Sequence, residues 1–265
     1  MLLNPKDFHY DYFHQKRGDG LSGAIHIGTP KTNGFCRVLV KDLYASDAIN
    51  EYLGCNIGQR IGVNTPRAWL FKPPYSKKKI AGIDFSHAVG IEYLENLGAT
   101  HIESYENKES TVQTIQGRLL HILMDEGDVI SFADSMNRVY TFDFADGLFP
   151  PNFEKCIGTP VMYMRFSEDS DEMYYERIIS GVERSVRDDM RWYLEDLKEE
   201  GISEEIVDFA FSSFKERFMS EYVKNQFSDL FQDIEVVFSG EVAVFTTALL
   251  KSAYNAMIGV TAIAA

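Results

Sequence analysis

A lysine and a glutamate stand near the start of the chain, where an alternating segment gives way to one with helical spacing. Lys41 ends the alternating segment, and Glu51 lies early in the helical one. A lysine at a strand end can neutralise phosphate charge, and a glutamate on the following helix can hold that lysine in place. Glu51 lies between Ile49 and Tyr52, at the margin of the apolar face, so its side chain can face a sheet. The pair therefore indicates phosphate chemistry, although a lysine that extends from a sheet edge is an ordinary structural alternative.

A glycine-rich polar loop precedes this pair. It reads KRGDGLSG over residues 16–23 and places glycines at Gly18, Gly20 and Gly23. Backbone N–H groups of such a loop can surround phosphate oxygens. The segment lacks the G-K-[ST] ending of a Walker A loop. By itself it fits a flexible turn as well as a phosphate cradle.

An aspartate in the middle of the chain is the third residue with chemical potential. Asp143 lies between Phe142 and Phe144, at the end of an apolar run. Burying a carboxylate there costs free energy unless it has a partner. A metal ion, a lysine or a backbone N–H group could be that partner, and Lys41 is one candidate. The six histidines show no H-E-x-x-H spacing, so we expect no zinc site.

The first hundred residues have mainly the pattern of strands. The first three segments are separated by polar turns, one of them with the Asn-Gly hairpin signal, and predict an antiparallel meander. A helix with Ser46 or Asp47 as its N-terminal cap follows the third strand. The predicted strands are residues 7–13, 24–29, 35–41, 66–71 and 87–98, and the predicted helix is 45–62.

The rest of the chain is mainly helical in pattern. Apolar residues recur at helical spacing, and one short segment has the pattern of a hairpin instead. Together with the strand-rich front, this predicts a bilobed α+β protein joined near residues 95–108. The predicted helices are residues 109–127, 171–200 and 203–231, and the predicted hairpin is 129–149.

Composition limits the function. The chain has 265 residues, of which 45% are hydrophobic, and a formal net charge of −14. This is typical of a globular protein, and the acidic surface disfavours direct binding of nucleic acid. Three widely spaced cysteines give no disulfide framework, so we expect a reducing, cytoplasmic location. The apolar segment 241–265 contains Lys251 and Asn255, which favours a buried helix over a membrane span.

Several of these segments together resemble HipA-like kinases. From Lys41 the sequence continues to INEYLGCNIGQRIGVNTPRAWLF, where Glu51 precedes an Ile-Gly-Val turn and Pro66 at a spacing similar to that of the family. The strand end VYTFDFADGLF is similar to the magnesium-binding segment, with Asp143 as its aspartate. HAVGIEYLENL fits the strand that leads to the hinge. The resemblance covers roughly residues 18–150, and its motifs are specific only in combination.

The resemblance implies a bilobed, protein-kinase-like α+β fold. An antiparallel five-strand lobe with one helix would span residues 1–97. A mostly helical lobe would span residues 98–265, with the metal and catalytic hairpin at 125–149. ATP and Mg²⁺ would bind between the two lobes.

The resemblance also assigns a role to each candidate residue. Lys41 would contact the phosphates and Glu51 would orient Lys41. Asp143 and Asp128 would bind Mg²⁺, and Asp125 would be the catalytic base. The residues that would bind ATP are Gly18, Gly20, Gly23, Lys41, Glu92, Tyr93 and Leu94.

The catalytic segment departs from the family pattern. HILMDEGDVIS contains no D-R-H or H-R-D string, and Asp128 stands where a metal-binding asparagine is expected. One interpretation is a shortened loop that still transfers phosphate to a protein hydroxyl, with a protein substrate or an antitoxin-like protein as partner. Another is a nucleotide-binding or protein-binding pseudokinase. The third is an unrelated α+β domain, in which MDEGD is an acidic helix end or a surface turn.

Overall fold

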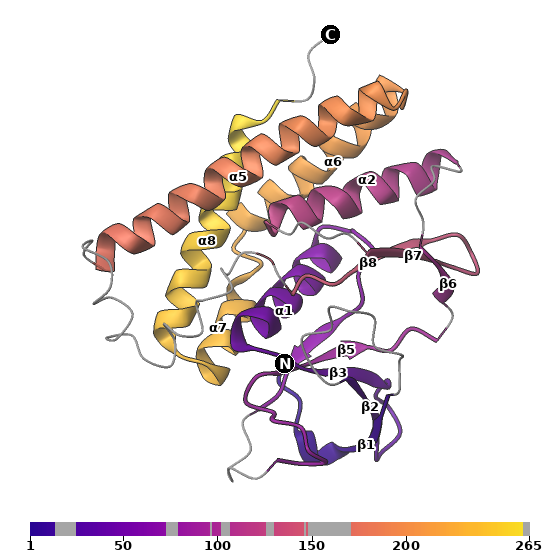
Figure 1. Ribbon diagram of the computed structural model, residues 1–265, viewed down its shortest axis with the longest axis vertical. Coiled ribbons are helices and arrows are strands. Elements are labelled where there is room, and N and C mark those ends of the chain that lie inside the picture. Colours follow the sequence, from indigo (N-terminus) through magenta and orange to yellow (C-terminus); the bar gives the residue numbers. More distant parts are fainter. Residues whose placement is uncertain are drawn as a thin grey trace.

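The computed structural model describes two lobes, one built on a sheet and one mostly helical (Figure 1). It describes residues 1–13, 25–72, 79–95, 97–101, 107–125, 130–145, 147 and 171–261.

The first lobe is an antiparallel sheet of five strands in the order β1-β2-β3-β5-β4. The predicted meander is present, because β1 pairs with β2 and β2 with β3. The fifth strand along the chain, β5, inserts between β3 and β4, so β4 lies at one edge. The strands are β1 (Phe8–Tyr12), β2 (Ile25–Pro30), β3 (Val38–Asp42), β4 (Ala68–Leu70) and β5 (Ala88–Glu92).

Helix α1 (Ala45–Arg60) follows β3 and lies where the two lobes meet (Figure 1). The predicted cap was wrong: Tyr44 is the N-cap residue and makes no side-chain hydrogen bond there, while Ser46 and Asp47 lie inside the first turn. Gly62 follows the helix with a positive φ of 75°, a conformation that glycine adopts without a steric penalty. Most of α1 is buried, which an amphipathic surface helix would not be.

A second, three-strand sheet and helix α2 begin the other lobe. The sheet has the order β6-β7-β8, and all its pairs are antiparallel. β7 and β8 form the predicted hairpin, whereas β6 occupies part of the segment interpreted as a linker and spans the expected boundary between residues 97 and 98. The elements are β6 (Leu97–His101), α2 (Lys108–Leu123), β7 (Ile130–Asp134) and β8 (Val139–Phe142).

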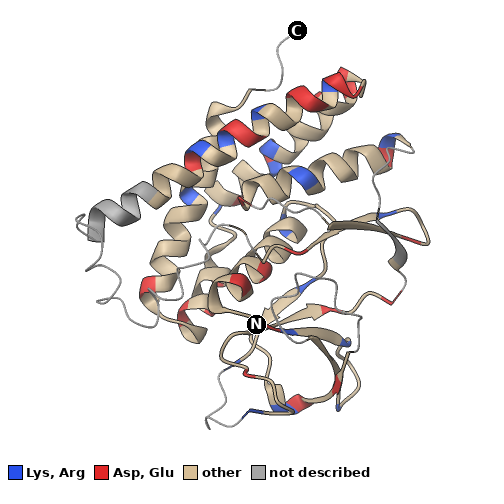
Figure 2. Ribbon diagram, viewed as in Figure 1, with Lys and Arg blue, Asp and Glu red and all other residues tan. Residues whose placement is uncertain are grey.

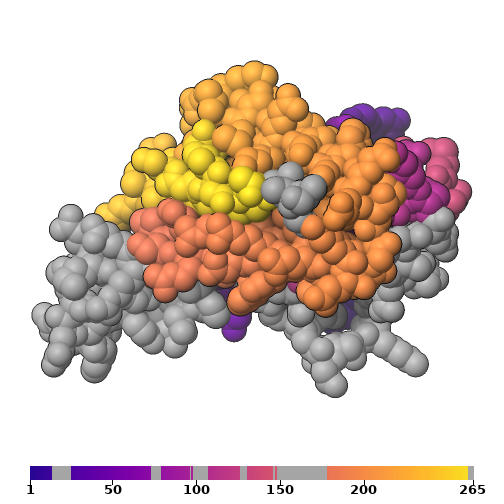
Figure 3. Space-filling model, turned by 90° about the horizontal axis from the view of Figure 1, so that it is seen from above, coloured from indigo at the N-terminus to yellow at the C-terminus, as the bar shows by residue number. Residues whose placement is uncertain are grey.

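The remaining helices form one packed layer. α5 packs along α8, and α6 packs on α2, as the views of Figures 1 and 3 both show. The predicted single helix 203–231 is two helices, because the chain turns at Asn225, whose φ is 58°. The helices are α5 (Asp171–Glu199), α6 (Glu204–Val223), α7 (Ser228–Val237) and α8 (Gly240–Gly259).

The sheet of the first lobe has a different core on each face. On one face, a small cluster that includes Phe8, Phe71 and Phe85 packs under the N-terminal residues and the segment before β5. On the other face, α1 joins the sheet to α2, α7 and α8 in one large cluster. Burial of this apolar surface is the main force that holds the two lobes together.

Acidic side chains gather at the outer end of the helical layer, where α5 meets α6 (Figure 2). This end contributes to the net charge of −14. In the described part of the chain, no helix is both long and apolar enough to cross a membrane.

Candidate functional site

Lys41 lies between two carboxylates that come from different lobes. Its Nζ donates to Glu51 Oε1 on α1, and it lies 3.0 Å from Asp143 Oδ1, just after β8. The Glu51 side chain is 0% exposed, that of Lys41 is 17% exposed, and that of Asp143 is 39% exposed. The cluster is therefore shielded from solvent at Glu51 and accessible to solvent at Asp143.

Burial and charge act against each other within this cluster. Burial raises the pKa of Glu51, although the Lys41 charge opposes the shift. Burial would also raise the pKa of Asp143, but the Lys41 charge and hydrogen bond outweigh it, and the pKa is lowered. Burial lowers the pKa of Lys41, but the two carboxylates overcome it and raise the pKa above its ordinary value. Lys41 is consequently held as a cation.

Asp143 is fixed by the residue that follows it. Phe144 is fully buried, and its ring stacks on His121 of α2 with ring centroids 4.4 Å apart. Gly54 of α1 also lies against this ring, where a Cβ atom would stand 2.3 Å from Phe144 Cγ. Asp143 itself has a φ of 62°, a left-handed conformation that costs free energy in a residue other than glycine and is enriched at functional sites.

A second contact ties this segment to α1. The Asn50 side chain donates from Nδ2 to the Ala145 carbonyl oxygen at 3.0 Å. The carbonyl group of Met124 also lies close to Gly147, leaving no space for a Cβ atom there. Ala145 and Gly147 are therefore in contact with α1 and with the end of α2, respectively.

An apolar surface lies beside Lys41 on the same face of the sheet. Ile25 pairs with Lys41, and Ile27 pairs with Leu39, so these side chains share one face. Each of the three apolar side chains is only half-buried. Sequence reasoning missed this surface. The strand alternation contains the signal, because residues two apart point the same way.

The backbone after β5 is only partly hydrogen-bonded. The N–H groups of Glu92 and Tyr93 donate to the carbonyl oxygens of Arg67 and Arg37, at 2.8 and 3.0 Å. Within the described residues, the N–H group of Leu94 has no hydrogen-bond acceptor. Of the three residues expected to meet adenine, Leu94 alone keeps its N–H group available.

Asp125 lies at the end of α2 with a φ of 54°. Burial raises the pKa of its carboxyl group, with Ser185 of α5 as a hydrogen-bond partner and Asp189 as a nearby charge. In the described part of the chain, nothing connects Asp125 directly to Lys41 or Asp143. The contacts of Asp125 in the described residues are thus with α5 and not with the Lys41 cluster.

Four candidate residues lie outside the described residues: Gly18, Gly20, Gly23 and Asp128. Among the residues that are described, no group of three or more His, Cys, Asp or Glu side chains could hold a metal ion. Asp143 is the predicted metal ligand that the structure describes.

Comparison with known proteins bears on the fold. No protein-family model matches the chain, and a search of curated proteins finds no match. Among solved structures, the crystal structure of a Helicobacter pylori proinflammatory kinase, CtkA, covers 96% of this chain and 99% of its own, with a TM-score of 0.50 and 11% sequence identity. Identity this low speaks for the fold alone. The predicted bilobed α+β architecture is confirmed, and the chain has a kinase-like fold.

Proposed function

We propose that this chain is an ATP-dependent phosphotransferase that resembles HipA-like Ser/Thr protein kinases, with a protein hydroxyl group as acceptor. The observation that carries the proposal is the position of the Lys41 ammonium between Glu51 and Asp143, one from each lobe. A cation held by a glutamate on a helix and facing an aspartate of the other lobe is the arrangement that protein kinases use for phosphoryl transfer. A cytoplasmic location and an antitoxin-like partner go with this proposal.

Nucleotide recognition is assigned to the face of the sheet that carries Lys41. The half-buried side chains of Ile25, Ile27 and Leu39 suit the flat apolar surface of a purine, and the Leu94 N–H group suits a ring nitrogen. Lys41 would contact the phosphates. Gly18, Gly20 and Gly23 would supply N–H groups to them, since these glycines precede β2 in the sequence.

The proposed metal ligands are Asp143 and Asp128. The donor set fits Mg²⁺, which is held by one or two carboxylates together with phosphate oxygens. The Asp143 carboxyl group has a lowered pKa, so it is ionised at neutral pH, and it is the most exposed member of the cluster. When bound, the ion would offset the negative charge that develops on the phosphates.

Asp125 is the proposed base. It stands in the turn that follows α2, on the chain segment that leads to the hairpin ending at Asp143. Its raised pKa makes its carboxylate a stronger base than an exposed aspartate. The direction of its contacts, toward Ser185 and Asp189 of α5, favours a second candidate function: a pseudokinase that binds nucleotide without efficient transfer.

Nucleotide binding is tested first. Saturating ATP with Mg²⁺ should raise the melting temperature of the wild-type chain, because a ligand that binds only the folded state stabilises it. Lys41→Ala and Asp143→Ala should lose most of this increase. Arg138→Gln, which breaks a surface ion pair of the β7–β8 hairpin, is the matched control and should keep it. An equal increase in all four proteins would reject the site.

Phosphate transfer separates the two candidate functions. We would measure transfer of the γ-phosphate to the chain itself and to casein, with Asp125→Asn beside the wild type. Transfer that disappears in Asp125→Asn supports the kinase. Nucleotide binding without any transfer supports the pseudokinase. Neither binding nor transfer would reject both and leave an unrelated α+β domain.

A further inference from the structure

Helix α1 is covered by other helices as well as by the sheet. Its residues from Ala45 to Leu53 are all buried, polar ones included. Besides the sheet and α2, helix α7 lies against both α1 and the edge strand β4. Leu230 and Ile234 of α7 belong to the same apolar cluster as Tyr52 of α1. The helix that carries Glu51 is thus packed between the sheet and the C-terminal helices.

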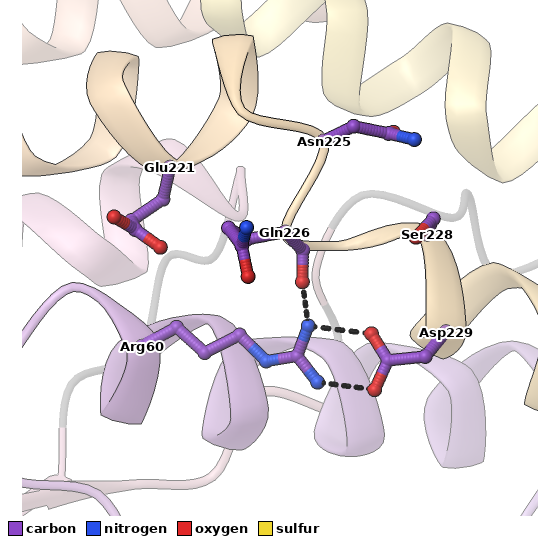
Figure 4. A pocket seen from close by; sticks show the side chains of 6 residues that line it. All are labelled: Arg60, Glu221, Asn225, Gln226, Ser228 and Asp229. Carbon is purple, nitrogen blue, oxygen red and sulfur yellow. Dashed lines mark hydrogen bonds and ion pairs between the residues drawn. The ribbon is translucent and has the colours of Figure 1, made fainter.

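The first polar bridge between α1 and α7 involves Arg60, the last residue of α1. Its two terminal nitrogens each lie 2.7 Å from a different carboxylate oxygen of Asp229, and one of them also donates to the Gln226 carbonyl oxygen (Figure 4). This is the two-point geometry in which a planar guanidinium holds a carboxylate in a defined orientation. The bridge forms one wall of an open surface pocket of about 450 Å³.

The second bridge starts beside Glu51. The Tyr52 hydroxyl group donates to Asp233 Oδ2 at 2.8 Å, and the same oxygen accepts from the Met1 ammonium group at 2.7 Å. Burial, and then the hydrogen bond to Asp233, raise the pKa of Tyr52 above its ordinary value. The hydroxyl therefore stays protonated and remains a donor.

We propose that these two bridges, Arg60–Asp229 and Tyr52–Asp233, form a latch through which α7 positions α1 and so holds Glu51 against Lys41. The inference rests on the proposed function only in its effect on catalysis. The two anchor residues of α1 are about 12 Å apart along the helix axis. Two anchors at that spacing fix both the tilt and the rotation of a rigid helix. Arg60, Tyr52, Asp229 and Asp233 are positioning residues, since they act on the site through Glu51.

The Arg60–Asp229 bridge affects position more than stability. The Asp229 side chain is 60% exposed, and an ion pair this exposed adds little to the free energy of unfolding. Glu51, by contrast, must stay within hydrogen-bonding distance of Lys41, and a displacement of about 1 Å breaks such a contact. A small movement of α1 therefore weakens the Lys41–Glu51 pair while the fold stays intact.

The test measures the reactivity of Lys41 itself. Lys41 acetylation by an amine-reactive ester, followed by mass spectrometry, reports on the amine without any need for catalysis. If α1 shifts, Lys41 loses Glu51 as a partner, and its cationic form is less stabilised. A larger fraction of the amine is then neutral, and the neutral amine reacts faster with the ester. We expect the rate of Lys41 acetylation to increase about three- to tenfold in Arg60→Gln and in Tyr52→Phe, which corresponds to a modest coupling between α7 and Lys41.

Two controls make the result decisive. Arg138→Gln removes another arginine–aspartate pair, on the β7–β8 hairpin, in which two guanidinium nitrogens contact one oxygen of Asp134, and it should leave Lys41 reactivity unchanged. Arg60→Glu and Asp229→Arg should each speed acetylation, while the double variant with both changes should return it toward the wild-type rate. Failure of the double variant to recover, or wild-type rates in Arg60→Gln and Tyr52→Phe, would reject the latch.

The catalytic readout separates the latch from the proposed function. If the wild-type chain transfers phosphate, Arg60→Gln should lower kcat by about three- to tenfold with a smaller change in the KM for ATP. If it transfers none, the kinase proposal fails, and Lys41 acetylation still decides whether the latch exists. A loss of kcat with unchanged Lys41 reactivity would also reject the latch.

Discussion

The contact between Gly54 and Phe144 leads to a prediction about stability that does not depend on function. In Gly54→Ala, the new Cβ atom would stand 2.3, 2.6 and 2.7 Å from three atoms of the Phe144 ring. Carbon atoms in contact are normally about 3.5–4.0 Å apart, so the ring or the helix must move by more than about 1 Å. The ring cannot easily yield, because it is fully buried and stacked on His121.

Two opposing effects determine the size of the change. Alanine in place of glycine inside a helix favours folding by about 1 kcal/mol. Overpacking a filled core costs about 1–3 kcal/mol. We therefore expect Gly54→Ala to lower the free energy of unfolding by about 1 kcal/mol. Asp143 should shift with the ring it precedes, so its contact with Lys41 should weaken as well.

Gly181 provides the matched control. It lies inside α5, and a Cβ atom there would meet nothing within 4 Å. Gly181→Ala should therefore raise the free energy of unfolding by about 0.5–1 kcal/mol, from helix propensity alone. Urea denaturation of both variants beside the wild type measures the difference, which should be about 2 kcal/mol. If Gly54→Ala were as stable as Gly181→Ala, the packing of Phe144 against α1 would be wrong.

The remaining predictions concern ionisation and the proposed site. Burial lowers the pKa of His121 to about 3, with the Arg118 charge acting in the same direction. Below about pH 6.5 only the unfolded chain takes up that proton, so stability is lost as the pH falls. Between pH 7 and pH 5 the wild type should lose about 2 kcal/mol more than His121→Phe in urea titrations; equal losses would contradict a buried neutral imidazole. Lys41→Met leaves the Glu51 carboxylate buried without its cation and should destabilise the fold by about 3–5 kcal/mol at pH 7. At pH 4 the loss should be smaller, because Glu51 can take up a proton. A loss of stability that is the same at both pH values in thermal unfolding would argue against a buried Glu51 carboxylate. Leu94→Pro removes one N–H group and should weaken ATP binding about two- to tenfold in calorimetry, with an unchanged melting temperature of the free protein; unaltered affinity would refute the assignment of that donor.

The strands of the first lobe were predictable because their alternation is local. β2 and β3 alternate between buried and half-buried residues, so the period of two is visible along the sequence, whereas β4 and β5 are short, almost fully buried apolar runs. β6 was missed because LGATH offers little alternation of apolar and polar residues. The turn between α6 and α7 was missed because aromatic spacing continues through it. Asn225 was the available signal, since asparagine is one of the residues that end a helix in a left-handed conformation.

The candidate site was predictable in part. Lys41 at a strand end and Glu51 on the next helix follow from patterns within ten residues of each other. The complete burial of Glu51 did not follow, because the helix pattern places it at the margin of the apolar face. Its carboxylate is buried against Lys41 of β3 and lies near Asp143, which comes from a distant part of the chain. The free N–H group of Leu94 depends likewise on which carbonyl groups its neighbours reach.

The sequence by itself determined the strands and the helix that carry Lys41 and Glu51, together with the chemical character of Asp143. Those features depend on side-chain periodicity and on residue type, both of which are local. Only the tertiary structure decided that Asp143 meets Lys41 across 102 residues of chain, and that α7 is hydrogen-bonded to α1. The physical reason is that buried charges require partners, and the packing of distant elements determines which partner is within reach.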